Sequence, residues 1–246
     1  MKLLVCISKT PETTAKITFT NDDTQFNSDG VQYIMNPYDE WYSLVRALEL
    51  KEANEGTVSL LSVGPAANDI IIRKGLALGA DDATRIDTEA LSAYYTASQI
   101  ANHIKDEAYD IIFFGKETID FNGSQVGAMV AELLDLPFLS YVSNMEVNGN
   151  TATITREIEG GVEVSEVNGA FVLSAAKGLA EQRIANMRGI MMSKRKPLNV
   201  VSPSVVDNPV EIIKYSKPET KSGVKMIDAE NMEELVRLLN EEAKVI

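Results

Sequence analysis

The stretch best suited to chemistry runs from Gly115 to Gln125 and reads Gly-Lys-Glu-Thr-Ile-Asp-Phe-Asn-Gly-Ser-Gln. It follows a short apolar run that opens with Asp110, a pattern typical of a strand buried on both faces of a parallel sheet. From Gln125 the apolar residues take helical spacing, so the polar stretch leads into a helix N-terminus. Free backbone N–H groups at such a point attract anions, which makes nucleotide binding the chemistry that this stretch supports. An ordinary connection between a strand and a helix has the same pattern, and both interpretations stay open.

Residues for bond-breaking chemistry are scarce. The chain has one histidine, His103, and one cysteine, Cys6. His103 lies on a predicted helix without acidic or cysteine neighbours, so we give it no role, and Cys6 lies in a predicted buried strand. No Ser/His/Asp or Cys/His pair, glycine-rich dinucleotide or P-loop motif, or metal-ligand cluster can be assembled. We therefore expect no catalytic and no metal-binding residues, and we expect a binding or carrier subunit rather than a self-sufficient enzyme.

Composition excludes several classes of partner. The chain has 246 residues and a net charge of −13, so a general affinity for nucleic acid or anionic membranes is not expected. One cysteine excludes an intramolecular disulfide. No apolar run approaches the ~20 residues that span a bilayer, so we expect no membrane insertion. The first residues enter a strand at once, and we expect no signal peptide and a location in the bacterial cytoplasm.

Strands and helices must alternate around this stretch. Helix-length connections between successive strands force a parallel sheet, so the first half of the chain predicts an α/β fold with a Rossmann-like, mostly parallel sheet flanked by helices. An Asn36-Pro37 pair starts the first predicted helix as cap and first helical position. The predicted strands are Leu3–Ile7, Thr57–Val63, Ala83–Ile86 and 110–114, with a polar, irregular excursion over Ser8–Asn27. The residues predicted to face the core from the four helices are Trp41, Leu44, Val45 and Leu48; Ile72, Leu76 and Ala77; Leu91, Tyr95 and Ile104; and Val126, Met129, Val130, Leu133 and Leu134.

The pattern changes in the second half of the chain. Asn144–Val147 and Thr151–Glu157 flank an Asn-Gly turn, which is the strongest short signal for a β-hairpin. Two further strands, Val162–Val167 and Ala170–Ala175, follow. We expect this antiparallel hairpin extension to lengthen one edge of the sheet.

Positive charge gathers between residues 177 and 198 of an otherwise acidic chain, together with Met187, Met191 and Met192. Methionines among arginines suit an adaptable docking surface. An amphipathic helix with solvated charges is the alternative. The basic residues of this docking segment are Arg183, Arg188, Lys194, Arg195 and Lys196.

The end of the chain reads as a separate part. Asn199–Gly223 carries three prolines and no periodicity, which is typical of an extended arm, and Asp228–Glu242 is a predicted helix. An arm and one helix cannot build a core of their own. We therefore expect two parts, an α/β nucleotide-binding domain over 1–198 and a C-terminal arm and helix over 199–246 that packs on a partner. The apolar stripe of the last helix is Met232, Leu235, Val236 and Leu239.

Several stretches together resemble the beta subunit of electron-transfer flavoprotein, in the adenine nucleotide alpha-hydrolase-like superfamily. They occur in the family's order and cover nearly the whole chain. They are LLVCISKTPETTAKI, DGVQYIMNPYDE, VSLLSVGPA, RKGLALGADDA, DIIFFGKETIDFNGSQVG, ITREIEGGVEV, NMRGIMMSKRKPL and SGVKM.

The resemblance implies a heterodimer with an alpha subunit that carries a redox-active FAD. Electrons then pass from dehydrogenases, such as the acyl-CoA dehydrogenases of fatty acid oxidation, to a quinone reductase or another acceptor. It also implies a structural AMP in this chain, with Asn36, Tyr38 and Val63 around the adenine and amides of Asn122–Val126 at the phosphate. The family's AMP pocket maps onto Cys6, Asn36, Pro37, Tyr38, Asp39, Val63, Gly115, Lys116, Glu117, Thr118, Ile119, Asp120, Phe121, Asn122, Gly123, Ser124, Gln125 and Val126.

The family's docking loop maps onto the segment 177–198, and the resemblance implies that Arg183, Met187 and Arg188 contact partner dehydrogenases. Met187 takes the place of the family's exposed aliphatic anchor. The sequence Ala180-Glu-Gln-Arg-Ile184 departs from the family's usual Asn-Glu-Pro-Arg-Tyr. Phe121 and Gly123 replace more polar residues of the well-known AMP-binding members.

Two other functions compete with this one. Electron-bifurcating members of the family place a second FAD in this pocket, and their Pro-Asp-Thr-Thr start is echoed by Pro11-Glu12-Thr13-Thr14. A free-standing nucleotide-binding protein of the universal-stress type has a related fold, but its glycine-rich phosphate loop is not found here. We expect AMP rather than a second FAD, because Phe121 and Glu117 leave less room for an isoalloxazine ring.

Overall fold

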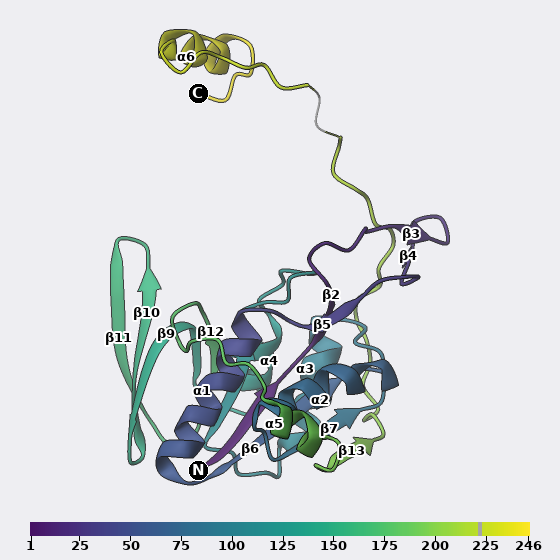
Figure 1. Cartoon of the computed structure of the whole chain (residues 1–246), viewed down its shortest axis with the longest axis vertical. Helices are drawn as coiled ribbons and strands as arrows, with labels where there is room; N and C mark the ends of the chain where they lie inside the picture. The colour runs from purple at the N-terminus through teal and green to yellow at the C-terminus, as the bar shows by residue number, and fades with distance from the viewer. Residues whose placement is uncertain (221–222) are drawn as a thin grey trace.

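The computed structural model describes residues 1–220 and 223–246, and its centre is a nine-stranded sheet in the order β11-β10-β9-β12-β8-β1-β6-β7-β13 (Figure 1). The large sheet holds β1 (Lys2–Cys6), β6 (Thr57–Val63), β7 (Asp82–Ile86), β8 (Ile111–Gly115), β9 (Phe138–Asn148), β10 (Thr151–Ile158), β11 (Gly161–Asn168), β12 (Phe171–Ala175) and β13 (Leu198–Val201). Two small antiparallel pairs are β2 (Lys9–Pro11) with β5 (Tyr33–Met35) and β3 (Phe19–Thr20) with β4 (Gln25–Phe26). The helices are α1 (Asp39–Asn54), the short 3-10 helix η1 (Ala66–Asn68), α2 (Asp69–Leu78), α3 (Ala93–Ile104), α4 (Val126–Leu133), α5 (Met187–Ser193) and α6 (Met232–Glu241).

The middle of the sheet is parallel because its strands are apolar on both faces. β1 pairs in parallel with β6 on one side and β8 on the other, and β12 pairs in parallel with β8. Successive residues of β1 enter opposite layers: Leu3 and Val5 pack with α1 and α2, whereas Leu4 and Cys6 pack with α3 and α4. This two-sided burial confirms the predicted Rossmann-like α/β fold.

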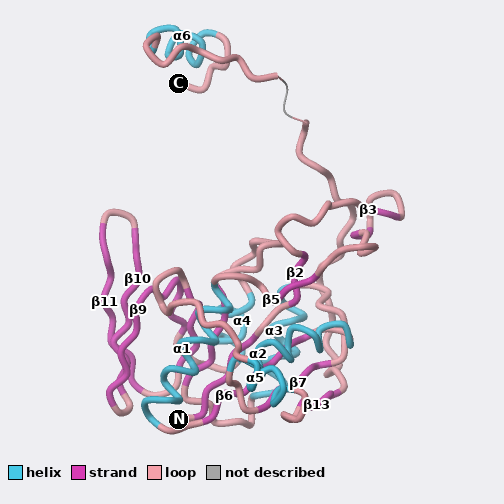
Figure 2. The backbone as a smooth tube through the Cα atoms, in the orientation of Figure 1, coloured by secondary structure: helices cyan, strands magenta, loops and turns pink. Residues whose placement is uncertain are grey.

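An antiparallel ribbon extends one edge of the sheet, as predicted. β9, β10 and β11 form it, and the turn that joins β9 to β10 places Gly149 at a φ of 62°, in the left-handed region that favours glycine (Figure 2). β9 is longer than predicted. Its first residues, from Phe138, pair in parallel with β12 before the strand leaves the sheet.

The first helix does not begin as predicted. Asn36 is not its cap and Pro37 is not its first residue, because α1 starts at Asp39 and its cap position, Tyr38, makes no side-chain cap hydrogen bond. The Asn36 side chain is used elsewhere, as described below. α3 is also shorter than the helix that the sequence pattern predicts over residues 89–107: it begins at Ala93, after Ser92 caps it by accepting a hydrogen bond from the N–H of Tyr95.

Two predicted core residues are exposed. Leu91 lies before α3 rather than on it, and Leu133 lies at the solvent side of the last turn of α4. The residues that α3 and α4 contribute to the core are Tyr95, Ala97, Ile100, Ala101, Ile104, Val130 and Ala131.

The arm begins later than the predicted residue 199, because Leu198–Val201 form β13 and pair in parallel with β7. Side-chain contacts on both halves of the arm then fasten it to the body. The buried side chain of Gln99 donates to the carbonyl of Ser204 (2.8 Å) and accepts from its N–H (2.8 Å). The Tyr215 ring stacks on Phe19 at 4.8 Å, in the excursion over Ser8–Asn27, which is not irregular but holds β2, β3 and β4.

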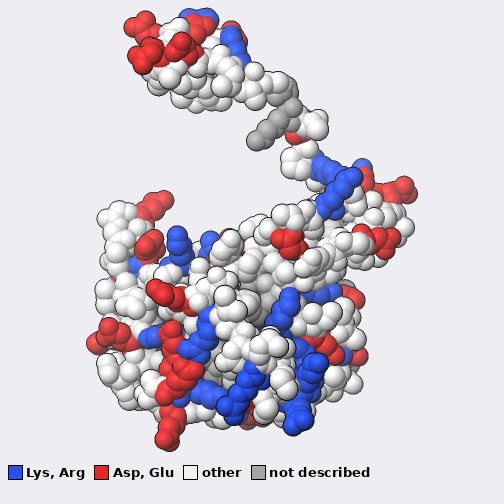
Figure 3. Space-filling model, viewed as in Figure 1, with Lys and Arg blue, Asp and Glu red and all other residues white. Residues whose placement is uncertain are grey.

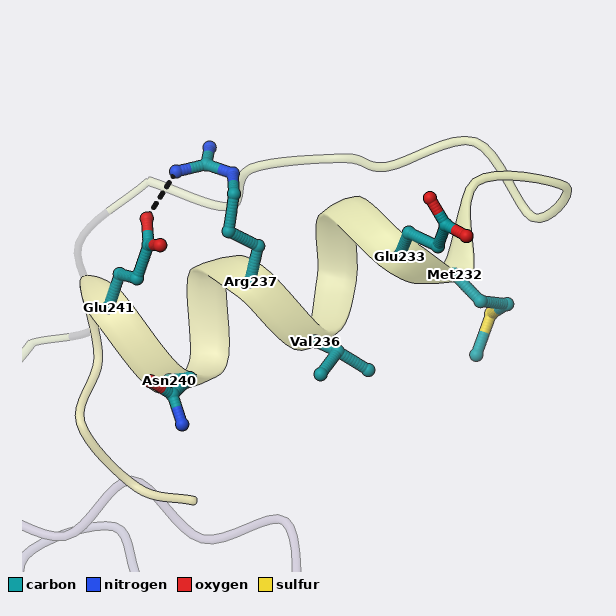
Figure 4. A pocket seen from close by; sticks show the side chains of 6 residues that line it. All are labelled: Met232, Glu233, Val236, Arg237, Asn240 and Glu241. Atoms are coloured by element: carbon teal, nitrogen blue, oxygen red, sulfur yellow. Dashed lines mark hydrogen bonds and ion pairs between the residues drawn. The ribbon is translucent and has the colours of Figure 1, made fainter.

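Beyond Tyr215 the arm leaves the body and carries α6 well away from the sheet (Figure 1). Along α6 lies a hollow of about 510 Å³, lined by Met232, Glu233, Val236, Arg237, Asn240 and Glu241. Met232 and Val236 point to one side of the helix, whereas Arg237 and Glu241 pair at 2.8 Å on the other (Figure 4). Met232 and Val236 of the predicted stripe are exposed, and the buried residue of the helix is Leu238, which the prediction left out.

Candidate functional site

The loop between β8 and α4 lies where the central strands end, beside the start of α1. Gly115 permits this approach: a Cβ at Gly115 would lie 2.8 Å from Cγ of Glu40 and 3.1 Å from its backbone nitrogen. Any larger residue would push α1 away from β8. The glycine therefore brings the loop 116–125 against the first turn of α1.

Asn36 holds this loop in place. Its buried side chain donates from Nδ2 to the carbonyl of Glu117 (2.9 Å) and accepts at Oδ1 from the N–H of Ile119 (3.0 Å). Both ends of the amide are thus satisfied by backbone groups more than 80 residues away in the sequence. Asn36 acts as a support for the loop.

Tyr38 has a strained backbone. Its φ is 64° and its ψ is −90°, and the N–H of Asp39 donates to the carbonyl of Pro37 at 3.0 Å across it. This is a γ-turn of the rare hand, which costs on the order of 1–3 kcal/mol and is found mostly at functional sites. The turn leaves the Tyr38 side chain exposed beside the loop.

The end of the loop offers backbone donors. Asn122 and Ser124, with φ of 48° and 50°, lie in the left-handed region on either side of Gly123, and the cap position Gln125 makes no side-chain cap hydrogen bond. Within residues 1–220 and 223–246, no protein acceptor is found for the N–H groups from Gly123 to Gly127. Unpaired N–H groups in such a turn and at a helix N-terminus form an anion-binding concavity.

Charged side chains beside the loop are mainly acidic. Burial raises the pKa of Asp39 to about 6, against the opposing effect of the nearby Lys116 ammonium. Burial also raises the pKa of Glu40 well above its ordinary value, although Oε2 of Glu40 accepts a hydrogen bond from the N–H of Ser8 (2.6 Å). Lys116 pairs with Glu117 at 3.2 Å, and this contact raises the pKa of the lysine. An anion would therefore be held by backbone N–H groups more than by cations.

Most of the predicted pocket lies at one edge of the sheet. Cys6 and Val63 are buried at the ends of β1 and β6, which are neighbours, and the loop follows β8 on the other side of β1. Burial raises the pKa of the Cys6 thiol well above its ordinary value, which leaves it an apolar wall residue. The predicted residues thus lie at the ends of three neighbouring strands, in the segment before α1 and in the loop after β8, and those from Asp120 to Gln125 are exposed.

Three residues beside the site were not predicted. Glu40 fixes the segment after β1 through Ser8, as described. The hydroxyl of Tyr141 lies 3.5 Å from Oγ of Ser124, and its N–H donates to Oγ of the buried Ser174 at 3.1 Å. Glu40 could have been found from the sequence, because it follows Asp39 at the start of a helix whose apolar residues form a stripe. No sequence pattern points to Tyr141, since its position depends on the irregular pairing of β9 with β12.

The docking segment 177–198 contains the short helix α5, capped by Asn186, whose Oδ1 accepts from the N–H of Gly189 (2.8 Å). Lys and Arg gather over this part of the molecule (Figure 3). Of the three predicted contact residues, Met187 and Arg188 are exposed, whereas Arg183 makes a two-pronged ion pair with Glu52 at 2.7 and 3.0 Å. The exposed apolar residues of the segment are Ile184, Met187, Ile190, Met191 and Met192.

Side-chain hydrogen bonds to backbone carbonyls join α2 to the segment that contains α5. Arg73 of α2 donates from Nη1 to the carbonyls of Ser193 (2.6 Å) and Lys196 (2.7 Å). In return, Nζ of Lys196 donates to the carbonyls of Leu76 (3.0 Å) and Ala80 (2.5 Å) at the end of α2. Carbonyls at a helix C-terminus have no partner within the helix, so cations there stabilise it. Lys196 is therefore a structural residue rather than a free basic group.

Two absences apply to residues 1–220 and 223–246. These residues bring together no group of three or more His, Cys, Asp or Glu side chains that could hold a metal ion. They also include no helix long and apolar enough to cross a membrane.

Comparison with known proteins agrees with this geometry. The family model of the electron transfer flavoprotein domain matches residues 23–206, which include the loop, the docking segment and the first part of the arm. The electron transfer flavoprotein subunit beta of Bacillus subtilis is 35% identical over 100% of both chains. The chain belongs to the electron transfer flavoprotein family. The family assignment removes the universal-stress alternative.

Two further relatives show the breadth of this family. The mitochondrial electron transfer flavoprotein subunit beta of Arabidopsis thaliana is 33% identical over 100% of both chains. A subunit of Acetobacterium woodii named caffeyl-CoA reductase-Etf complex subunit CarD is 29% identical over 96% of this chain and 95% of its own.

Proposed function

We propose that this chain is the beta subunit of a heterodimeric electron transfer flavoprotein whose alpha subunit holds most of the FAD. The complex carries electrons from dehydrogenases, such as acyl-CoA dehydrogenases, to a quinone reductase or another acceptor. The observation that carries the proposal is the loop 116–125, supported by Asn36 and open to an anion through unpaired N–H groups, in a chain of this family. The flavin supplies the redox chemistry, and this chain supplies binding and docking.

A structural AMP fits the loop. Its phosphate would be held by the N–H groups from Gly123 to Gly127, and Lys116 is a nearby cation among several carboxylates. Such a site suits a monophosphate better than a chain of phosphates, because each added charge would face Asp39 and Glu117. The exposed Tyr38 and the apolar Val63 and Cys6 are available for the adenine side of the pocket.

A second FAD at the same site is the other candidate, and it would make the complex an electron-bifurcating one. The observation in its favour is the sequence Pro11-Glu12-Thr13-Thr14, which is similar to the start of the bifurcating members. The segment Pro11–Thr14, which echoes the bifurcating members, forms a closed turn in which Glu12 accepts from the N–H of Thr14 at 2.9 Å.

Nucleotide analysis separates the two candidates. The alpha and beta chains are co-expressed, the complex is purified and denatured, and the released nucleotides are counted against protein. We expect one AMP and one FAD per heterodimer. Two FAD and no AMP would replace the first candidate by the second, and a complex without any nucleotide in this chain would reject both.

We also propose that residues 1–198 form the nucleotide-binding and docking part and that residues 199–246 pack on the alpha subunit. Met187 is the proposed anchor for partner dehydrogenases. Truncating an interface anchor costs ~2 kcal/mol or more, roughly thirtyfold in affinity. Met187→Ala should raise the apparent KM for the dehydrogenase and leave FAD content unchanged. An unchanged KM would make the segment a solvated helix.

A further inference from the structure

Three methionine side chains stand exposed on one short helix. Met187, Met191 and Met192 of α5 have 74, 68 and 47% of their surface accessible. Two methionines of the core, Met35 and Met145, have 2 and 0% accessible. Three thioether sulfurs are thus exposed to solvent close together on α5. The two core methionines are buried and serve as internal controls.

The helix that carries them cannot turn to hide them. A Cβ at Gly189 would lie 2.3 Å from the carbonyl oxygen of Ala77, so the backbone of α5 lies directly on the end of α2. Arg73 and Lys196 fasten the end of the segment by four hydrogen bonds to carbonyls. The face that bears Met187 and Met191 is therefore held outward.

Exposed thioethers have a defined chemistry. A hydroperoxide transfers one oxygen atom to the sulfur: the O–O bond breaks, the S–O bond forms, the sulfur loses two electrons and the hydroperoxide leaves as water or an alcohol. The product, methionine sulfoxide, is polar and chiral, and methionine sulfoxide reductases convert it back at the expense of thiols. Oxidation thus changes an apolar, adaptable side chain into one that disrupts methionine-rich interfaces.

We propose that α5 is a reversible oxidation site, at which a hydroperoxide converts Met187, Met191 and Met192 to sulfoxides and thereby weakens docking of the partner dehydrogenase. The docking half of this inference rests on the proposed function, whereas the site of oxidation does not. Arg188, Lys194 and Arg195 keep their charge, so oxidation removes the apolar part of the surface and leaves its basic part.

The test uses the complex with its alpha subunit and a graded series of hydrogen peroxide concentrations. Peptide mass spectrometry follows each methionine, and the KM for a dehydrogenase is measured before and after treatment. We expect the three methionines of α5 to oxidise at least tenfold faster than Met35 and Met145, and KM to rise roughly tenfold. Treatment with methionine sulfoxide reductases should restore the original KM.

Two variants locate the effect. In Met187→Leu/Met191→Leu/Met192→Leu, peroxide should cause no further change in KM, whatever the starting value. Met226→Leu/Met232→Leu removes the methionines of the arm and α6, which we propose to pack on the alpha subunit, and so separates their oxidation from that of α5; in this variant peroxide should still raise KM. Equal oxidation of the α5 and core methionines, an unchanged KM after oxidation, or a peroxide response in the triple variant would each overturn the inference. Mass spectrometry measures the order of oxidation without any dehydrogenase. If the proposed function is wrong and α5 does not bind a dehydrogenase, the untreated variant Met187→Ala will have an unchanged KM.

Discussion

Single side chains at the candidate site serve to fix backbone rather than to react. The side-chain amide of Asn36 both donates to and accepts from the backbone of the loop. Gly115 has no side chain, which allows α1 to pack closely, and Glu40 accepts a hydrogen bond from the N–H of Ser8. The groups left for a ligand are backbone N–H groups. This arrangement suits a chain that binds a nucleotide and leaves redox chemistry to a flavin.

Replacing Asn36 by alanine tests the support of the loop. Asn36→Ala leaves the carbonyl of Glu117 and the N–H of Ile119 without the side-chain partner that each has now. Each buried polar group that loses its partner costs ~1–3 kcal/mol. We expect the melting temperature of the complex to fall by roughly 5 °C or more and AMP to be lost on gel filtration. Asn102→Ala, at an exposed position, is the control, and equal behaviour of the two variants would contradict this role.

Asp39 should make stability depend on pH. Its pKa is raised by burial to about 6, so the folded chain binds this proton more tightly than the unfolded chain, whose carboxyl has a pKa of ~3.9. The stabilising effect of the proton is complete below about pH 4 and is lost as the pH rises through about 6. The ionised buried carboxylate then opposes folding.

Asp39→Asn removes this titration. The difference in melting temperature between variant and wild type should be small near pH 4 and should shift in favour of the variant between pH 4 and 7. Thermal unfolding of the complex at several pH values with saturating AMP measures it. The exposed Asn102→Ala, which removes no titratable group, is the control, and a flat profile for Asp39→Asn would refute the assignment.

At the scale of elements, the contact between α2 and α5 fixes the position of the segment 177–198, which we propose to be the docking surface. Each helix end is satisfied by a cation from the other element, and Gly189 lies against the backbone of Ala77. The segment therefore behaves as part of the α/β body. Two basic residues of this segment, Arg183 and Lys196, are thus paired within the chain, although Arg183 was expected to contact a partner.

Gly189→Ala tests this contact. The added Cβ would lie 2.3 Å from a backbone oxygen that has no side-chain freedom to move. Overpacking of this kind costs ~1–3 kcal/mol, and α5 must shift outward. We expect faster amide hydrogen exchange in residues 187–196 and a higher KM for the dehydrogenase. Gly161→Ala, where an added Cβ meets nothing within 4 Å, should change neither quantity.

Elements with strong local patterns were predicted from the sequence, and those that depend on distant partners were not. β6, β8 and β12 are buried runs whose residues identify them without context. β13 has four residues, of which two are exposed, and it is a strand only because β7 lies beside it. The pair Asn36-Pro37 is a helix-start signal in isolation, but the contact of Asn36 with the loop overrides it. The strand ends and the loop that hold the predicted nucleotide residues were recognisable from local patterns, whereas the contacts of Glu40 and Tyr141 depend on tertiary structure.

At the scale of the whole molecule, the chain is an α/β body with two projections, the ribbon β9–β11 and the arm that ends in α6 (Figure 1). The ribbon continues the sheet and is stiffened by pairing with β12, whereas α6 is joined to the body only through the arm. The exposed Met232 and Val236 on α6 are consistent with our proposal that it packs on the alpha subunit.

Truncation separates the two parts of the arm. Deleting residues 216–246 removes α6 but keeps β13 and the anchors at Gln99 and Tyr215. We expect this variant to retain AMP and to dissociate from the alpha subunit faster. Deleting residues 199–246 also removes most of β13, so it should lower the melting temperature as well. Dissociation rates by surface plasmon resonance and thermal unfolding distinguish the two, and equal rates for full-length and 216–246-deleted chains would exclude a role of α6 in assembly.

The stacking of Tyr215 on Phe19 divides the arm into a fixed part and a tether of roughly 15 residues before α6. A linker of that length can place α6 on the order of 20 Å from Tyr215, at a millimolar effective concentration near the body. If the contact of α6 with the alpha subunit breaks while the α/β body stays bound, α6 would therefore rebind before the subunits separate. Even a weak α6 contact then gives a long-lived complex, and its lifetime should shorten as residues are inserted between Tyr215 and α6.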